Sequence, residues 1–244
     1  MAPNIFNLTR EWLDNSGIAF LAEKALPSTN DLAKSEAFAP EIANEKIYLA
    51  DAQTKGRGRG TNTWLTPPSG HALLITWSWG LTKAAQPITG PLLGLHIYRA
   101  ILKAFSPAQL NPLNLSIKTP NDIYLREKKM LGILAEAVQQ GNRHRLIVGI
   151  GLNVFSAPAE VETAGCLSDA FTVTANLWFR FLDALAHELR DAVTNVTSTA
   201  MGESDCYELL TALRRHPSGA RYTRVLENGD LQTITGDTLS WRNL

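Results

Sequence analysis

Residues 50–59 read Ala50-Asp51-Ala52-Gln53-Thr54-Lys55-Gly56-Arg57-Gly58-Arg59, and this stretch decides the expected fold. It begins as a strand and passes into a loop in which cations alternate with glycine from Lys55 to Gly60. Glycine lets a backbone approach an anion closely and adopt turns that other residues avoid. Arginine presents planar donors that match phosphate or carboxylate oxygens two at a time. Such a loop suits a phosphoanhydride or a mixed acyl-phosphate.

Four other interpretations of this loop compete with that one. It is not a dinucleotide fingerprint, because Thr61 stands where the third glycine belongs, and it is not a P-loop, because no Gly-Lys-Ser/Thr follows. RNA-binding Arg-Gly tracts repeat many times, whereas this chain has a single copy. A solvated surface loop is the remaining alternative, and spacing alone supports it as well as it supports a binding loop.

The pattern on either side of the loop predicts an α/β protein. Strands are expected over residues 47–53 and 71–79, and the loop between them covers 54–70. Further strands are expected over 18–25, 116–118, 129–138 and 145–154, and helices over 9–15, 28–38, 89–105, 178–193 and 207–214. Residues 140–142 suit a hairpin turn. We therefore expect a mixed β-sheet flanked by helices over residues 1–200, and a helix with a small β-hairpin over 201–244.

Composition excludes several classes of protein. The 244 residues carry 23 Lys plus Arg and 23 Asp plus Glu, so the formal net charge is zero. That balance argues against a broad nucleic-acid-binding face, which needs many cations to neutralise phosphates. No stretch approaches the ~18 apolar residues of a membrane span. Two cysteines without Cys-x-x-Cys spacing indicate neither a disulfide scaffold nor zinc, and no apolar leader is visible, so we expect a cytoplasmic protein.

Four segments in order connect the chain to a known family. Besides residues 50–59, followed by Trp64 and Pro67, they are Ser28-Thr29-Asn30, Lys118-Thr119-Pro120-Asn121-Asp122 with Lys129-Met130-Leu131-Gly132-Ile133-Leu134, and Gly149-Ile150-Gly151-Leu152-Asn153. In sequence and spacing they resemble the biotin protein ligases. The resemblance implies a biotin/lipoate ligase-type catalytic domain. It also implies an activity: biotin and ATP form biotinyl-AMP, and the biotin then passes to a lysine of a biotin carboxyl carrier protein.

The same resemblance implies roles for residues around the loop. Ser28, Thr29 and Gln53 would hold the ureido ring of biotin, with Asn30 completing that segment. Arg57 and Arg59 would grip the biotin carboxylate and the acyl phosphate, Arg59 as a catalytic residue. Gly56 and Gly58 would let the loop wrap over the ligand, and Trp64 would pack the closed loop. Helix capping by Ser28 and core packing by Trp64 are the alternative roles.

Further roles follow from the later segments. Lys129 would lie against the carboxylate and the α-phosphate, where a fixed cation stabilises developing negative charge. Gly132 and Leu134 would line the biotin pocket. Asp122 would bind Mg²⁺ and orient or deprotonate the acceptor lysine. The remaining residues matched to the ligand-binding segments are Lys118, Asn121, Gly149, Gly151 and Asn153.

Two departures from the family pattern stand out. Thr119 occupies a position where the family has tryptophan, and residues 60–63 carry no charge where the family has further arginine. A lipoate or octanoate ligase or transferase stays open as an alternative, and so does a non-catalytic biotin- or nucleotide-binding homologue. Only 27 residues precede Ser28, too few for the winged helix-turn-helix of ligase-repressors, so we expect no DNA binding. The oligomeric state is left open, with a homodimer as one option.

Overall fold

The computed structural model describes residues 3–105 and 113–244. The chain folds into two compact units, and neither unit is continuous in sequence. The first unit comprises residues 1–84 and 130–182, and the second comprises residues 85–129 and 183–244. The boundary expected at residue 200 rests on a change in the sequence pattern, whereas the two units are defined by their internal contacts. That boundary therefore stays a prediction.

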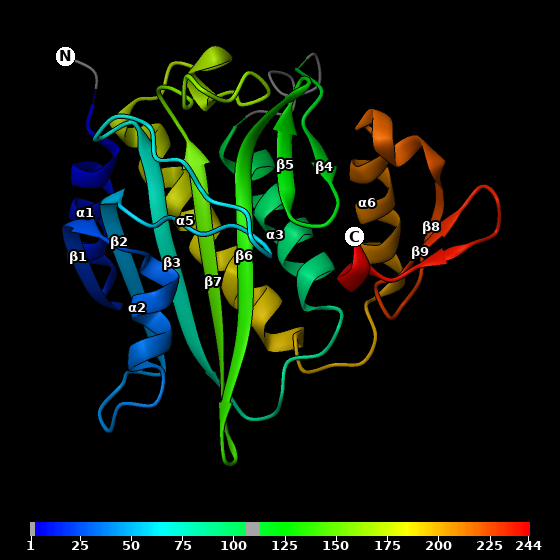
Figure 1. Cartoon of the computed structure of the whole chain (residues 1–244), viewed down its shortest axis with the longest axis horizontal. Helices are drawn as coiled ribbons and strands as arrows, with labels where there is room; N and C mark the ends of the chain where they lie inside the picture. The colour runs from blue at the N-terminus through cyan, green and yellow to red at the C-terminus, as the bar shows by residue number, and fades with distance from the viewer. Residues whose placement is uncertain (1–2, 106–112) are drawn as a thin grey trace. The chain divides into compact units, whose positions relative to one another are not determined.

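The first unit is built on strands in the order β1-β2-β3-β7-β6 (Figure 1). Their bounds are β1 Ala19–Leu26, β2 Glu45–Gln53, β3 Ala72–Leu81, β6 Lys128–Gln140 and β7 Arg143–Asn153. β1 pairs with β2 in parallel, and the other pairs are antiparallel. The expected mixed sheet is confirmed, and each of these expected strands is present with small shifts at its ends.

Local sequence explains the helices of the first unit. α1 (Ile5–Ser16) begins at Asn4, whose side chain accepts from the Asn7 backbone N–H, and ends at Gly17, whose φ of 71° suits glycine. α2 (Thr29–Glu36) begins at Ser28. α1 packs against β2 and β3, and α2 packs against β2, β3 and β7.

The centre of the first unit is strand β3, which is buried on both faces. Leu73, Ile75 and Trp77 alternate with Leu74 and further buried residues along the strand. Such a continuous buried run needs cover on each side of the sheet. Around α2, the covering core consists of Ala33, Ala37, Tyr48 and Ile147, with Leu21, Leu32, Phe38 and Val138 packed against it.

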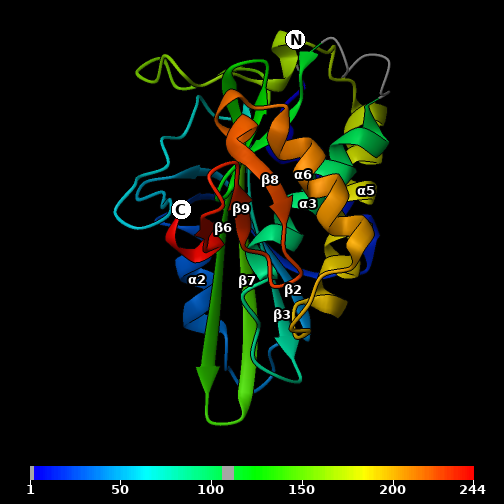
Figure 2. The ribbon, with the colours of Figure 1, turned by 90° about the vertical axis from the view of Figure 1, so that its right-hand side faces the viewer.

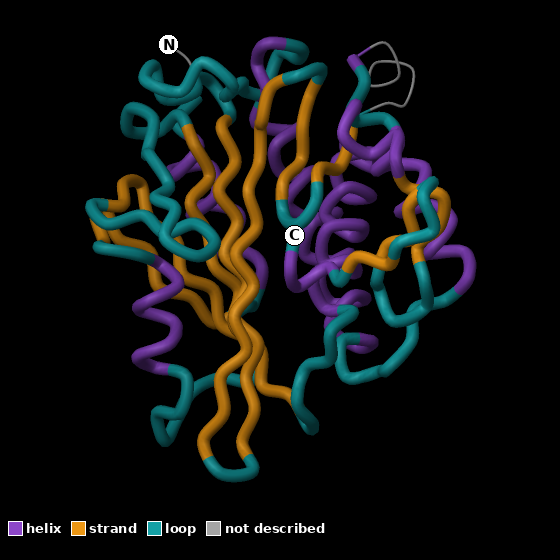
Figure 3. Tube along the Cα trace, turned by 45° about the vertical axis from the view of Figure 1, so that its right-hand side comes forward, coloured by secondary structure: helices purple, strands orange, loops and turns teal. Residues whose placement is uncertain are grey.

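β6 and β7 form the expected long hairpin, which Figure 3 shows as two strands joined by a short turn. The turn lies between Gln140 and Arg143, and Gly141 has a φ of 58° that glycine adopts without strain. This hairpin brings the sequence segments around Gly132 and Gly151 side by side in the first unit.

The second unit is mainly helical (Figure 2). α3 (Thr89–Ala104) is buried along most of its length, and α6 (Glu203–Arg214) packs against it and against β4 and β8. α5 (Ala175–Asn195) begins in the first unit and ends in the second. The strands described in this unit are β4 Ser116–Lys118, β5 Asp122–Leu125, β8 Tyr222–Val225, β9 Leu231–Thr233 and β10 Thr238–Leu239. The 3-10 helices among the described residues are Leu167–Asp169 in the first unit and Pro217–Arg221 and Trp241–Asn243 in the second.

Two features of the second unit differ from the sequence-based expectation. β5 pairs with β4 in an antiparallel hairpin that was not expected, because a segment containing Pro120 and Asn121 is typical of a turn without a strand after it. The C-terminal hairpin gains a third strand, in the order β10-β9-β8. None of the helices within residues 3–105 and 113–244 combines the length and apolarity needed to cross a bilayer.

Candidate ligand site

The start of α2 gathers the first group of candidate residues. Ser28 is buried, and its hydroxyl accepts from the Asp31 backbone N–H over 3.3 Å, so it caps the helix. The Gln53 side-chain oxygen accepts from the Thr29 backbone N–H at 2.7 Å and from the Thr29 hydroxyl at 3.2 Å. The structure therefore joins the end of β2 to the start of α2 through polar side chains.

A second row of residues crosses the sheet beside this helix start. Thr76, Gly149 and Leu134 pair with one another across β3, β7 and β6, so they share a face of the sheet. The Thr76 hydroxyl contacts Thr29 Oγ1 at 2.8 Å and Asn30 Oδ1 at 2.7 Å. Asn30 Nδ2 donates to the Leu134 carbonyl over 3.1 Å. Both the nitrogen and the oxygen of the Asn30 side-chain amide are therefore hydrogen-bonded to the sheet.

Glycine is required where Asn30 meets the sheet. A Cβ on Gly149 would clash with the Asn30 side-chain amide. The next row on the same face is Leu74, Gly151 and Gly132, with Gly151 directly opposite Gly132. A Cβ on Gly151 would stand 2.6 Å from Cε2 of Trp64. The two facing glycines therefore leave room on the sheet surface that the Trp64 ring borders.

The glycine–arginine loop folds into a tight turn above this face. The Gly58 backbone N–H donates to Asn62 over 2.8 Å, the Asn62 N–H to the carbonyl of Arg59 over 3.2 Å, and the Trp64 N–H to Gly56 over 3.0 Å. A Cβ on Gly56 would collide with the Trp64 carbonyl. The loop is thus a compact backbone hairpin whose start depends on Gly56.

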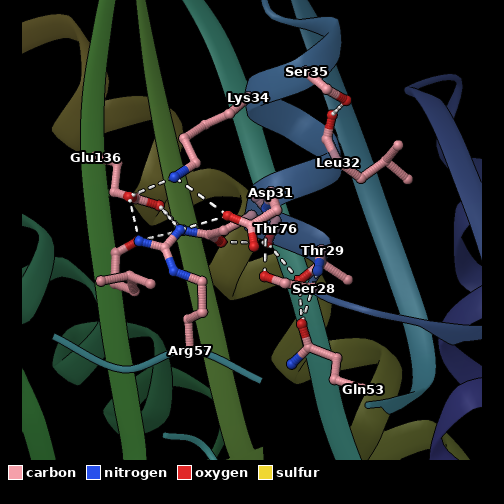
Figure 4. A network of polar contacts seen from close by, with 12 residues as sticks. Ser28, Thr29, Asp31, Leu32, Lys34, Ser35, Gln53, Arg57, Thr76 and Glu136 are labelled. Atoms are coloured by element: carbon pink, nitrogen blue, oxygen red, sulfur yellow. Dashed lines mark hydrogen bonds and ion pairs between the residues drawn. The ribbon is translucent and has the colours of Figure 1, made fainter. Parts of the chain in front are cut away.

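Arg57 ties this loop to α2 and β6. Its Nη1 lies 2.6 Å from Asp31 Oδ1, and its Nη2 lies 3.0 Å from Glu136 Oε1. Lys34 adds a second cation, 3.0 Å from Glu136 and 3.3 Å from Asp31. Figure 4 shows these four side chains turned toward one another beside Thr29 and Thr76. In this arrangement Arg57 is neutralised by protein carboxylates, so a ligand carboxylate or phosphate would compete with them.

Glu136 is the central acceptor of this network. Burial alone would raise its pKa, but hydrogen bonds from Asn30, Lys34 and Arg57 outweigh that effect and lower the pKa below the ordinary 4.5. Glu136 is therefore ionised at neutral pH. Its side chain is 21% exposed, so its charge is only partly screened by solvent.

The end of the loop and the end of β7 are held by buried polar residues. Asp51 is 5% exposed and accepts from the Gly70 backbone N–H at 2.7 Å and from the Ser69 hydroxyl at 2.6 Å. Asn153 is 2% exposed, and its Nδ2 donates to the Gly165 carbonyl over 3.1 Å. In the structure both residues anchor loops at this end of the sheet.

The second unit carries the other candidate residues. Lys129 Nζ lies 2.7 Å from Asp122 Oδ1, with side chains 32% and 16% exposed. Lys118 Nζ lies 3.4 Å from the Tyr124 hydroxyl and over the face of its ring. Asn121 is half-buried between β4 and β5. Lys129 and Asp122 thus form one ion pair at the β4–β5 hairpin.

Two aromatic residues near the C-terminus hold this hairpin, and sequence reasoning did not single them out for that role. The Tyr222 hydroxyl lies 3.2 Å from Thr119 Oγ1, and Trp241 Nε1 donates to the Pro120 carbonyl over 2.9 Å. A Cβ on Gly90 would meet Trp241 Nε1 at 2.9 Å, so α3 is close as well. Thr119, the departure from the family pattern, therefore makes a polar contact through its hydroxyl.

The candidate site residues can hold a magnesium ion only together with a bound substrate that supplies further oxygen ligands. Within residues 3–105 and 113–244, no group of three or more His, Cys, Asp or Glu side chains could hold a metal. Mg²⁺ bound with a nucleotide keeps several waters and needs one or two carboxylates besides the phosphates. Asp122 can supply one such carboxylate once Lys129 turns to another anion.

The structure also adds Asp31, Lys34, Thr76 and Glu136 to the candidates. Strand periodicity could have predicted Glu136 as a site residue. It follows Gly132 and Leu134 at alternate positions of β6 and so shares their face of the sheet. Helix spacing gives the signal for Lys34, which lies one turn after Asn30 on α2. Asp31 and Thr76 gave no comparable signal.

Fold and site together define an α/β protein whose sheet carries a cluster of polar side chains, beside a helix start and under a glycine–arginine loop. Residues 22–153, more than half of the chain, match the model of the Biotin/lipoate A/B protein ligase family. The chain belongs to that family.

Curated relatives agree with this assignment. The biotin–[acetyl-CoA-carboxylase] ligase of Paracoccus denitrificans is 35% identical over 134 residues, covering 54% of this chain and 52% of the relative. Biotin–protein ligase 2 of Arabidopsis thaliana is 31% identical over 130 residues, covering 53% and 38%. The chain thus spans about half or less of the length of these two relatives.

Among solved structures, a biotin protein ligase from Aquifex aeolicus in complex with biotin and ATP has the same fold. It superposes with a TM-score of 0.63 at 22% identity, covering 91% of this chain and 95% of the other. The fold therefore extends well beyond the residues that the family model matches.

Proposed function

We propose that this protein is an ATP-dependent biotin protein ligase. One observation carries the proposal: Thr29, Asn30, Gln53 and Thr76 form a hydrogen-bonded polar group next to the facing glycines of the sheet. Such a group suits a small ring rich in N–H and C=O groups, like the ureido ring of biotin. The facing glycines let that ring approach the backbone closely.

In the first step, a biotin carboxylate oxygen attacks the α-phosphorus of ATP. A P–O bond forms to the carboxylate, the bond to the β-phosphate oxygen breaks, and pyrophosphate leaves. Negative charge concentrates at the α-phosphate, where Lys129 and Arg59 supply fixed cations. Lys118 and Asn121 would contact the nucleotide, and Asp122 would bind the Mg²⁺ that shields the leaving pyrophosphate.

In the second step, the lysine amine of a biotin carboxyl carrier protein attacks the acyl carbon of biotinyl-AMP. An amide bond forms, AMP leaves with the electron pair of the acyl–oxygen bond, and the amine loses a proton. Asp122 is the carboxylate proposed to orient that amine and accept its proton. This proposal goes with the sequence-based expectation of a cytoplasmic enzyme.

A turnover assay tests the proposal directly. The protein is incubated with ATP, Mg²⁺ and either biotin or lipoate, and pyrophosphate release and label transfer to a carrier domain are followed. We expect both signals with biotin and neither without ATP. Signals that depend on lipoate and ignore biotin would identify a lipoate ligase instead. Biotin binding without turnover would identify a non-catalytic homologue.

A further inference from the structure

Arg145 is a buried cation near the start of β7. Arg145 is only 5% exposed to solvent. Nε donates to the Ser78 hydroxyl at 2.6 Å, and Nη2 donates to the backbone carbonyls of Ala43 at 2.6 Å, Asn44 at 3.3 Å and Ser78 at 3.2 Å. Every one of these acceptors is uncharged. The positive charge of Arg145 therefore has no counter-charge among them.

A buried charge without a partner is unfavourable, and natural proteins usually pair it. Burial lowers the pKa of Arg145, the Tyr48 hydroxyl opposes this, and the nearby charge of Arg143 lowers it further. The two like charges of Arg143 and Arg145 repel each other. An anion bound beside them would remove that repulsion.

A cavity of ≈ 320 Å³ lies at this end of the first unit. That volume falls in the ~300–1,000 Å³ range of small-molecule sites. Among the described residues, its polar lining comes from Asn44, Thr82, Asn142, Arg143, His144 and Arg145, and none of the lining residues is a carboxylate. The cavity is therefore open to an anion and carries positive charge on its wall.

Because residue 80 is a glycine, the cavity extends as far as the guanidinium of Arg145. It pairs directly with Arg145 across β3 and β7, and a Cβ on it would stand 3.8 Å from Arg145 Nη1 and 2.6 Å from Asn44 Oδ1. Among the described residues, none accepts a hydrogen bond from Nη1. A side chain at Gly80 would fill the space in front of Nη1, so glycine keeps this donor open to the cavity.

We propose that this cavity binds a phosphate group, either free or as a small phosphomonoester. Phosphate oxygens point in several directions and so can accept from Arg145, Arg143 and the Asn44 and Thr82 side chains together, whereas a planar carboxylate offers two oxygens. The site is separate from the proposed biotin site. Arg145 precedes Gly149 by four strand residues, roughly 13 Å along β7.

Thermal unfolding tests the proposal. Inorganic phosphate should raise the melting temperature above that in sodium chloride of equal ionic strength, by about 5 °C when phosphate exceeds its Kd ~100-fold. Glycerol 3-phosphate tests the phosphomonoester. If both compounds raise the melting temperature, the cavity accepts phosphomonoesters as well as free phosphate. If inorganic phosphate alone raises it, the cavity is a site for the free anion. No rise over chloride with either compound overturns the proposal.

A matched pair of variants locates the effect. Thr82→Glu places a carboxylate in the cavity as an internal counter-charge, while Thr82→Gln has a similar size and no charge. We expect the phosphate-dependent rise to fall at least fivefold in Thr82→Glu and to remain in Thr82→Gln. Phosphate bound at the residues proposed for ATP would still stabilise Thr82→Glu, so an undiminished rise in that variant also overturns the proposal.

Discussion

The guanidinium of Arg57 spans both carboxylate oxygens of Glu136, with Nη2 3.0 Å from Oε1 and Nη1 3.3 Å from Oε2. This two-point contact connects the glycine–arginine loop to the middle of β6. Such bidentate pairs fix orientation as well as adding energy. The loop is therefore held over the sheet by the protein's own charges.

Replacing Glu136 by Gln should destabilise the fold by about 1 kcal/mol at pH 7, a modest value because the Arg57 side chain is 35% exposed and solvent screens the pair. Since the Glu136 pKa is lowered, its contribution is complete above the ordinary value of 4.5 and is lost as the pH falls below it. The difference between variant and wild type in urea unfolding should shrink in that acidic range. A constant difference would contradict this. Glu160→Gln, at an exposed position, is the control.

Ligand should slow amide hydrogen exchange in residues 54–70. The loop hairpin rests on few backbone bonds, and its cation Arg57 can exchange protein carboxylates for ligand oxygens. Local opening should therefore become rarer with biotin and ATP bound. Exchange measured by mass spectrometry with and without ligand checks this, and equal protection in both states would count against it. The core strand β3 serves as the internal control.

Gly151→Ala should destabilise the first unit by about 1–3 kcal/mol, the usual cost of overpacking. The new Cβ would lie 2.6 Å from the Trp64 ring and push it away from the facing glycines. The KM for biotin should rise as well. Gly94→Ala is the matched control, because its Cβ would meet no atom within 4 Å. Urea unfolding of both variants gives the comparison, and equal effects would show that the Trp64 contact is unimportant.

Lys129→Ala should slow biotin-dependent exchange of pyrophosphate with ATP by ~10²–10³, the usual effect of removing a donor aimed at developing charge. The loss should appear mainly in kcat. Lys128→Ala changes the neighbouring exposed lysine and should leave the rate nearly unchanged. If the two variants lose activity equally, Lys129 has no special position at the α-phosphate.

Thr61→Arg should lower the KM for ATP about tenfold, because one charge-assisted phosphate contact contributes ~1.5–3 kcal/mol. Thr61 is exposed beside Gly60 in the uncharged part of the loop. Biotin affinity should change little, since its proposed contacts lie at Thr29 and Gln53. Thr61→Gln controls for size, and steady-state kinetics gives both constants. A change in biotin affinity alone would remove residues 60–63 from the neighbourhood of the nucleotide.

The sheet of the first unit could be predicted because its signals are local. Apolar runs define β2, β3 and β7, and the Gly141 turn fixes the hairpin of β6 and β7. Chain order also places Ser28 at a helix start, where it serves as the cap. These features depend on residues within a few positions of one another.

The ion network and the aromatic contacts of the C-terminal region could not be predicted in the same way. Arg57 reaches Glu136 across 79 positions of the sequence, and Trp241 reaches Pro120 across 121. Periodicity gives the face of a strand but not the helix or loop that covers it. β5 was missed because a strand of four residues after Pro120 has too little pattern of its own.

The discontinuous first unit has a consequence for synthesis on the ribosome. β3 emerges with β2 available on one side, but its other partner, β7, ends 72 residues later at Asn153. At a synthesis rate of ~5–20 residues per second, the apolar edge of β3 stays without that partner strand for roughly 4–14 s. An unpaired apolar strand edge is a template for aggregation. Nascent chains stalled between residues 81 and 153 should therefore engage chaperones at β3, and release them once β7 has left the exit tunnel.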